Sequence, residues 1–263
     1  MSWHNLLFIG LIFTTILMFI SWLWAVKIDN FGIVDAVWSF CFLFHAIIFY
    51  CFSDGFLTRN IIFLVMIGLW SCRLGFYLAR RLYHLHPEED TRYQHLRAGY
   101  NEKFKIKFLI FYFYQAISVS VLTLPFIFVF NNPIESSLTW EIAGLVYWLL
   151  ALVGETIADY QMSQFKKLSK SNPAMGRTCN IGLWKYSRHP NYFFESNVWI
   201  GFFIFMIGSG VFWGLYPAVV ILLLLLKVTG VPPSEEQSLK TRGDEYRAYQ
   251  KKTSVFIPWF PKS

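Results

Sequence analysis

The hydrophobic positions of this chain fall into seven long runs separated by polar segments, roughly residues 6–26, 31–51, 60–79, 108–130, 140–163, 191–208 and 210–228. A helix needs about 20 mostly apolar residues to cross the hydrocarbon core of a bilayer, and each run is that long or nearly so. The pattern therefore predicts an all-α protein, a polytopic membrane bundle of about seven transmembrane helices. Because Met1-Ser-Trp-His-Asn lacks the Lys- or Arg-containing start of a signal peptide and no small-residue cleavage site follows, we expect the first run to be a span.

Composition agrees with this class. Of 263 residues, 56% are hydrophobic, 20% aromatic and only 15% charged, which is not typical of a soluble domain. The four cysteines stand singly and show no Cys or His spacing of a metal site, so we predict no metal.

Lysine and arginine occupy alternate polar segments. If the N-terminus lies outside, 22 of the 23 basic residues fall in or beside inner segments, and only Arg59 lies outside. Since inner loops of membrane proteins are enriched in Lys and Arg, we predict an external N-terminus and a cytoplasmic C-terminus. The net charge of +7 needs no nucleic acid as a partner, because anionic lipid headgroups and an anionic cofactor explain it.

The segment Gly182-Leu-Trp-Lys-Tyr-Ser-Arg-His-Pro-Asn-Tyr-Phe-Phe-Glu195 passes from a basic loop into the sixth apolar run. Pro190 favours the first turn of a helix, so a helix is expected to begin at this point. Asn191 and Glu195 are four residues apart and share one face of that helix. The positive end of the helix, together with Lys185, Arg188 and His189, is suited to a phosphate group.

Polar side chains inside the other runs mark further candidates. Asp35 lies about one turn inside the second run, where an ionisable group is either functional or paired with an interfacial cation, here Arg73 or Lys27. His45, deeper in the same run, is expected to be a satisfied core histidine. In the fifth run a continuous polar face is predicted for a ligand-lining role or an ion-pair stripe between helices; it comprises Glu155, Asp159, Ser163 and Lys166.

These segments resemble those of the steroid 5-alpha-reductase and sterol-reductase superfamily of membrane enzymes. The likeness rests on the 182–195 segment, on Glu155 to Lys166 before it, and on Gly243, Tyr246, Tyr249 and Pro258 after it. It is strongest to an uncharacterised bacterial reductase-like branch, in which Val34 to Trp38 and Glu89 to Tyr93 also have counterparts. The shorter Arg-His-Pro-x-Tyr core is shared with isoprenylcysteine methyltransferases.

The resemblance implies a multi-pass protein of a bacterial inner membrane that binds NADPH from the cytosolic side and reduces an activated, enone-like carbon–carbon double bond of a steroid or other lipid. It implies one integral-membrane domain over 1–263, with the cofactor half at about 140–263. No Gly-x-Gly-x-x-Gly unit is present, so the bundle itself must hold the dinucleotide. The cofactor-binding residues expected from the resemblance and the basic tail are Asp159, Lys166, Tyr186, Arg188, His189, Asn191, Tyr192, Glu195, Tyr246, Arg247 and Tyr249.

At the substrate end, steroid reductases use a membrane-embedded glutamate and a tyrosine, whereas the corresponding segments here offer Asp35 and Trp70. Asp35 is predicted to be the catalytic acid, because an apolar helix favours a neutral carboxyl group that can donate a proton. Trp38 and Trp70 are predicted to be walls of the substrate pocket. Tryptophan has no phenolic proton, so the steroid arrangement is not reproduced by Trp70.

Two other functions fit the same pattern. One is an S-adenosylmethionine-dependent membrane methyltransferase of the isoprenylcysteine methyltransferase type. The other is a lipid-binding or transport protein in which the buried carboxylates form an ion pathway, although no inverted repeat of broken spans is visible. The sequence does not identify the substrate, the NADPH or NADH preference, or the oligomeric state.

Overall fold

The structure is a computed structural model of the chain, and it describes residues 1–135 and 138–262. In this part of the chain every regular element is helical, apart from one isolated bridge between Ser187 and Ser254. The chain divides into two compact units. Unit 1 comprises Met1–Leu138 with Gly208–Val211, and unit 2 comprises Thr139–Ile207 with Phe212–Ser263.

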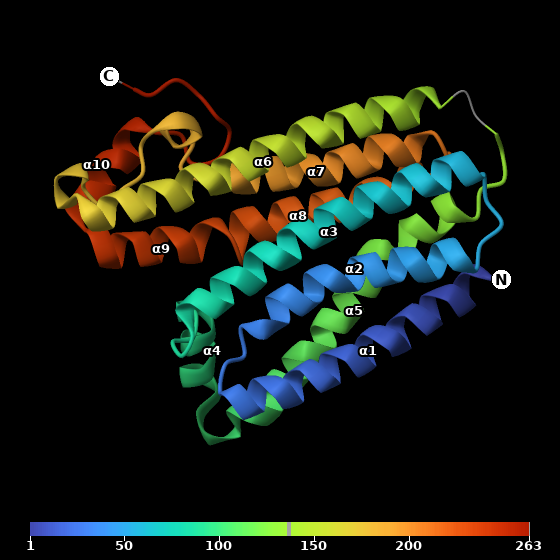
Figure 1. The fold of residues 1–263 in the computed structure, drawn as a ribbon, viewed down its shortest axis with the longest axis horizontal. Coiled ribbons are helices and arrows are strands. Elements are labelled where there is room, and N and C mark those ends of the chain that lie inside the picture. The colour runs from blue at the N-terminus through green and yellow to red at the C-terminus, as the bar shows by residue number, and fades with distance from the viewer. Residues whose placement is uncertain (136–137, 263) are drawn as a thin grey trace. The chain divides into compact units, whose positions relative to one another are not determined.

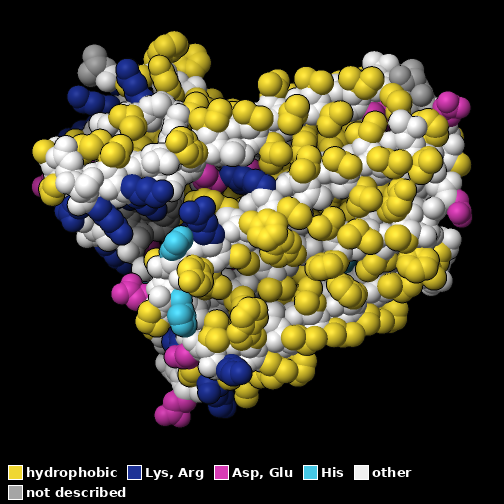
Figure 2. Space-filling model, in the orientation of Figure 1, with side chains coloured by type: hydrophobic (Ala, Val, Ile, Leu, Met, Phe, Trp, Pro, Cys, Tyr) yellow, Lys and Arg dark blue, Asp and Glu magenta, His cyan; other side chains and the backbone are white. Residues whose placement is uncertain are grey.

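Unit 1 is built from long helices that run side by side, with a short helix, α4, at the end where α3 finishes (Figure 1). Its elements are α1 (Trp3–Ile28), α2 (Ile33–Cys51), α3 (Leu57–Leu85), α4 (Thr91–Tyr100), the 3-10 helix η1 (Asn101–Lys103) and α5 (Phe104–Phe130). Figure 2 shows hydrophobic side chains along this unit, while lysine, arginine and histidine gather at its α4 end. This distribution is the one a bilayer requires, because apolar surface faces lipid and charge stays in the headgroup region.

Unit 2 pairs α6 with α7 and ends in two short polar helices (Figure 1). Its elements are α6 (Thr139–Ser171), η2 (Pro173–Met175), η3 (Gly182–Lys185), α7 (Pro190–Ile207), η4 (Phe212–Leu215), α8 (Tyr216–Lys227), α9 (Val231–Arg242) and α10 (Asp244–Lys252).

Glycines permit the close approach of α6 and α7. A Cβ on Gly144 of α6 would lie 2.4 Å from the backbone nitrogen of Phe205, and one on Gly201 of α7 would lie 2.6 Å from Cβ of Trp148. Neither backbone could stay in place with a larger residue. Small residues at helix contacts are the usual means of packing in membranes, where the hydrophobic effect does not press helices together.

Six helical segments are long and apolar enough to cross a membrane, so the chain is a polytopic helical membrane protein. They are Trp3–Ile28, Ile33–Cys51, Leu57–Leu85, Thr91–Phe130, Thr139–Ser171 and Phe212–Arg242. The sequence predicted about seven, and the difference is α7. Its 18 residues include Asn191, Glu195 and Asn197, whose polarity lowers the mean hydropathy of the whole helix.

His45 has the structural role expected of it. Its imidazole lies between the hydroxyl groups of Thr14 on α1 (2.7 Å) and Thr123 on α5 (2.8 Å), and it is fully buried. Because both ring nitrogens have partners, the histidine joins three helices at the centre of unit 1 without leaving a buried polar atom unpaired.

Candidate functional site

The predicted helix start at Pro190 is confirmed, and the C-terminal tail is attached beside it. α7 begins at Pro190. Just before it, the Arg188 N–H donates to the Ser254 carbonyl (2.8 Å), and the Trp259 N–H donates to the Tyr186 carbonyl (2.9 Å). The Ser187 hydroxyl is fully buried and donates to the Phe256 carbonyl (2.7 Å). The segment 186–190 is therefore a fixed loop in unit 2, closed by residues about 70 positions further along the chain.

One carboxylate, Glu235 of α9, organises the polar groups behind this loop. Its oxygens accept hydrogen bonds from Arg188 Nε (3.0 Å) and Nη2 (3.1 Å), from the Tyr246 hydroxyl (2.7 Å) and from the Gln250 amide (2.5 Å), and His189 Nε2 lies 2.8 Å away. The Glu235 and Arg188 side chains are only 14% and 12% exposed. We call these five residues the Glu235 cluster. It joins the start of α7 to both α9 and α10.

Most N–H donors of Arg188 are hydrogen-bonded within the protein. Besides its two bonds to Glu235, Nη1 donates to the carbonyls of Gln250 (3.0 Å) and Thr253 (2.9 Å). A guanidinium group has five N–H donors, so four are already engaged. The geometry fits a residue that positions the loop, whereas the predicted phosphate contact of Arg188 remains a prediction.

The histidine and tyrosines predicted for the cofactor also belong to this network. The His189 ring is buried and stacks on Tyr192, with centroids 5.3 Å apart and planes at 7°. The Tyr249 hydroxyl donates to the Trp184 and Ser187 carbonyls. Burial, with the adjacent Glu235 carboxylate, raises the pKa of Tyr246 above its usual range. These hydroxyl groups therefore act as hydrogen-bond donors at neutral pH.

Asn191 and Glu195 lie one turn apart on α7, as predicted. Glu195 is buried and Oε1 accepts a hydrogen bond from Trp199 Nε1 (3.0 Å). The side-chain oxygen of Asn191 is buried, and no described residue donates to it. Since buried carbonyl oxygens are nearly always hydrogen-bonded, this atom calls for a partner beyond those that the described residues supply.

The other predicted cofactor residues are distributed over unit 2. Asp159 is buried on α6, where the preceding carbonyl of Ala158 accepts a bond from Trp184 Nε1 (2.9 Å). Lys166 is exposed further along α6. Tyr186 lies in the fixed loop against Phe260, and Arg247 is exposed on α10 beside Asp244 (3.2 Å). α6 thus places a buried acidic residue and an exposed basic residue within two turns of each other.

In unit 1, Asp35 is held by two residues of α4. Arg92 Nη2 lies 2.9 Å from Oδ2, and the Tyr93 hydroxyl donates to Oδ1 (2.6 Å). The expected pairing of Asp35 with an interfacial cation is thus present, although the cation is Arg92. A small cavity of about 20 Å³ borders both Asp35 and Tyr93, which is enough for about one water-sized group.

Asp90 fixes α4 in this position. Its Oδ1 accepts from the Arg92 N–H (3.0 Å), which caps the helix, and it also pairs with the guanidinium groups of Arg92 and Arg81. Burial alone would raise the pKa of Asp90, but the charges of Arg92 and Arg81 lower it. The carboxylate thus stays ionised at neutral pH and keeps Arg92 directed towards Asp35.

The two predicted pocket tryptophans are part of one aromatic cluster. Phe42 lies edge-on to both, with centroid distances of 4.7 Å to Trp38 and 5.1 Å to Trp70. Trp70 is fully buried, while Trp38 is half-buried and donates to the Ser118 hydroxyl (2.9 Å). Trp70 therefore packs in the core of unit 1, and the assignment of both residues to a substrate pocket remains a prediction.

Sequence reasoning missed Glu235, Gln250, Arg92 and Tyr93. Glu235 stands in a short polar helix after Pro232-Pro233, next to a second glutamate, and nothing in that pattern separates the two. Arg92 and Tyr93 belong to the segment from Glu89 to Tyr93 that resembles the bacterial branch, and this resemblance is the signal that points to them.

Comparisons with known proteins assign the chain to a family. Residues 21–253 match a family model described as "Protein of unknown function (DUF1295)". The "Uncharacterized protein C594.04c" of Schizosaccharomyces pombe is 25% identical over 219 residues, which cover 75% of this chain and 63% of that protein. The chain thus spans under two thirds of the length of this relative. No solved structure matches the chain significantly. Because the family model covers nearly all of the helical region, the chain belongs to the DUF1295 family.

Proposed function

We propose that this protein is an NADPH-dependent membrane oxidoreductase that reduces an activated carbon–carbon double bond of a lipid-like substrate. The resemblance of the 182–195 segment to steroid 5-alpha-reductase-like membrane proteins supports this reaction class. The observation that carries the proposal is the buried, unpartnered oxygen of Asn191, one helical turn from the buried Glu195.

The residues around Asn191 fit a nicotinamide group. A carboxamide has two N–H donors and one carbonyl acceptor, so it can donate to Asn191 Oδ1 and to a carboxylate oxygen of Glu195 at once. The bound cofactor would supply the hydride. The chain's own part is to hold the carboxamide on one face of α7, and the Glu235 cluster keeps the start of that helix in place.

For the phosphates, the exposed cations among the predicted residues of unit 2 are Lys166, Lys185 and Arg247. The donors of Arg188 are mostly engaged, so its contribution would be to position the loop from 186 to 190. A fixed loop lowers the entropy lost on binding, because its backbone is already ordered.

Reduction of an enone also needs a proton, and we assign it to Tyr93 together with Asp35. Asp35 accepts two hydrogen bonds, so the hydrogen shared by this pair resides on the Tyr93 oxygen. On substrate binding the single Tyr93 O–H would turn from Asp35 to a substrate carbonyl oxygen and donate to it as negative charge develops there. Asp35 then becomes the positioning residue, and Tyr93 supplies the hydroxyl group that Trp70 lacks.

Ligand-induced thermal stabilisation tests the cofactor assignment. A ligand at 100 times its Kd stabilises a folded state that alone binds it by about 2.7 kcal/mol. We expect NADPH to raise the melting temperature of the purified protein and Glu195→Ala to abolish the rise. Asn197→Ala, two residues further along α7, serves as the matched control and should retain it.

Two outcomes would reject the assignment. One is an equal NADPH response in wild-type protein and Glu195→Ala. The other is stabilisation by S-adenosylmethionine alone, which would favour the methyltransferase.

A further inference from the structure

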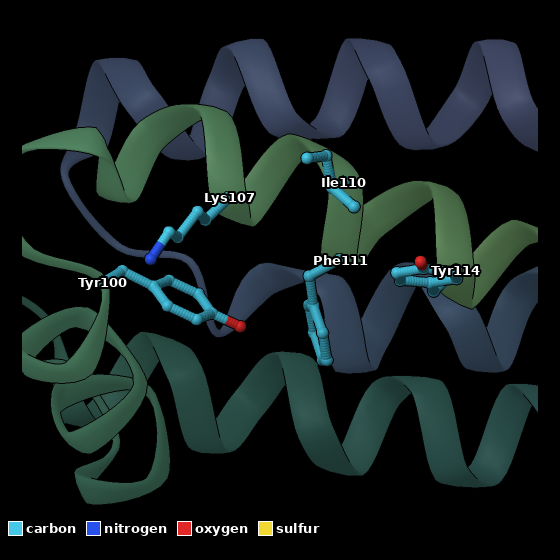
Figure 3. Close-up of a pocket in the computed structure, with 5 residues that line it drawn as sticks. All are labelled: Tyr100, Lys107, Ile110, Phe111 and Tyr114. Carbon is cyan, nitrogen blue, oxygen red and sulfur yellow. The ribbon is translucent and has the colours of Figure 1, made fainter.

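Unit 1 carries a surface cavity of about 180 Å³ that the proposed reaction does not use. It is lined by Tyr100, Lys107, Ile110, Phe111 and Tyr114 (Figure 3). The last four come from α5 at positions i, i+3, i+4 and i+7, so they share one face of the helix. Tyr100, the last residue of α4, closes the charged end. The cavity is therefore a short apolar slot with a single cation at one end.

The cation is held in place by an aromatic ring. Lys107 Nζ lies 5.3 Å from the ring centroid of Tyr100, within the range of a cation–π contact. Figure 3 shows the Lys107 amine and the Tyr100 ring side by side at the same end of the slot. Among residues 1–135 and 138–262, no carboxylate forms an ion pair with Lys107. An anion entering the slot would therefore meet a positioned ammonium group that is not neutralised.

The local charge also favours an anion. The first turn of α5 contains basic residues and no acidic residue. Lys103, Lys105 and Lys107 fall within five positions, against the single acidic residue Glu102 just before them. Basic groups are unfavourable near the positive end of a helix dipole, and a bound anion offsets that repulsion.

An exposed apolar stripe continues from the slot along the same helix. Ile110, Tyr114, Ile117 and Val121 are 48%, 65%, 48% and 49% exposed, and their spacing of four, three and four keeps them on one face. From Lys107 to Val121 the helix rises about 21 Å at 1.5 Å per residue. This exceeds one half of a hydrocarbon core about 30 Å thick, so the stripe crosses a full leaflet.

A cation at the headgroup level and an apolar stripe one leaflet long match one class of molecule. We propose that this slot binds an anionic phospholipid, with its phosphate on Lys107 and the first part of an acyl chain between Tyr100, Phe111 and Tyr114. The charge distribution predicts the cytoplasmic leaflet for this end of α5, where anionic lipids carry the surface charge. The site is independent of the proposed reductase activity.

Lys105 provides a matched control within the same turn. Its ammonium group lies 5.9 Å from the Phe104 ring, and it does not line the slot. The test is native mass spectrometry of the full chain, released from detergent with phosphatidylglycerol or phosphatidylcholine. We expect phosphatidylglycerol to bind wild-type protein more tightly than phosphatidylcholine. Lys107→Ala should weaken phosphatidylglycerol binding about fivefold or more, and Lys105→Ala should weaken it less than twofold.

A second pair of variants tests the shape of the site. Ile110→Trp keeps Lys107 and fills the slot, so it should also weaken the binding of phosphatidylglycerol. Lys107→Arg keeps the charge and should retain this binding. Size-exclusion profiles establish that each variant is folded. Equal effects of Lys105→Ala and Lys107→Ala would reduce the site to general surface charge and overturn the proposal. So would unchanged binding in Ile110→Trp, because the slot would then take no part of the lipid.

Discussion

Glu235 is expected to determine whether the C-terminal helices stay attached to the start of α7. In Glu235→Ala, Arg188 loses two bonds and keeps a side chain that is only 12% exposed, and Tyr246 and Gln250 each lose an acceptor. Removing one partner of a buried ion pair costs about 3–5 kcal/mol. Because the Glu235 and Arg188 side chains retain some contact with solvent, we expect a cost at the lower end of this range, about 3 kcal/mol. That value corresponds to about a hundredfold in the opening equilibrium, at 1.4 kcal/mol per tenfold.

Hydrogen–deuterium exchange measures this opening through named amides. The N–H groups of Arg188 and Trp259 donate to the carbonyls of Ser254 and Tyr186, so both lose protection when the tail detaches. Peptides covering 186–190 and 255–260 should exchange about a hundredfold faster in Glu235→Ala than in wild-type protein.

The neighbouring glutamate is the control for this experiment. Glu236 forms an ion pair with Lys240 (2.6 Å) in which the side chains are 66% and 53% exposed. Such a helix pair is worth about 0.3–0.5 kcal/mol, which is about twofold. If Glu235→Ala and Glu236→Ala changed exchange at Arg188 and Trp259 equally, the role given to the Glu235 cluster would be wrong.

Three further predictions concern other parts of the chain. Tyr93→Phe should slow reduction of an enone lipid by about 10²–10⁴-fold while leaving the NADPH-induced thermal shift unchanged; a matching loss of NADPH binding would contradict its assignment to the proton. Gly201→Val should abolish the monodisperse folded protein in size-exclusion chromatography, since even Cβ would lie 2.6 Å from the Trp148 side chain, whereas Gly99→Ala, with no atom within 4 Å, should not. Burial alone would raise the pKa of Glu245, but the neighbouring Thr178 side chain and the hydrogen bonds from the backbone N–H groups of Arg177 (2.9 Å) and Thr178 (2.6 Å) lower it. The lowered pKa means that this anchor stabilises the fold at pH above the ordinary glutamate value of about 4.3 and is lost as pH falls through the folded value. The protection factors of the amides at 177–178, which are corrected for the intrinsic pH dependence of exchange, should therefore fall in acid in wild-type protein and change little in Glu245→Gln.

Much of the helical architecture could be predicted because its causes are local. Length and hydrophobicity define the long helices, and Pro190 defines the start of α7. The number of spans does not follow from length alone, because it depends on whether a helix as polar as α7 still counts as a membrane segment. Its close packing on α6, through Gly144 and Gly201, follows from contacts that no local pattern contains.

The polar centres were only partly predictable. The sequence identified Arg188, His189 and Tyr246, but it gave no reason to join them through Glu235, which lies 47 residues after Arg188 in a polar helix. The partners of Asp35 were missed for the same reason, since α4 brings them back from 57 and 58 positions away. A buried carboxylate can be located from sequence, whereas the donors that complete it depend on the tertiary fold.

The most direct measurement of the central claim follows the hydride itself. Purified protein in nanodiscs is incubated with a lipid extract and NADPH that carries deuterium at the transferable position, and the lipids are analysed by mass spectrometry. We predict a saturated lipid product that contains one deuterium on carbon and forms only with active protein. Transfer of a labelled methyl group from S-adenosylmethionine to a lipid, with no deuterium in any lipid product, would contradict the account.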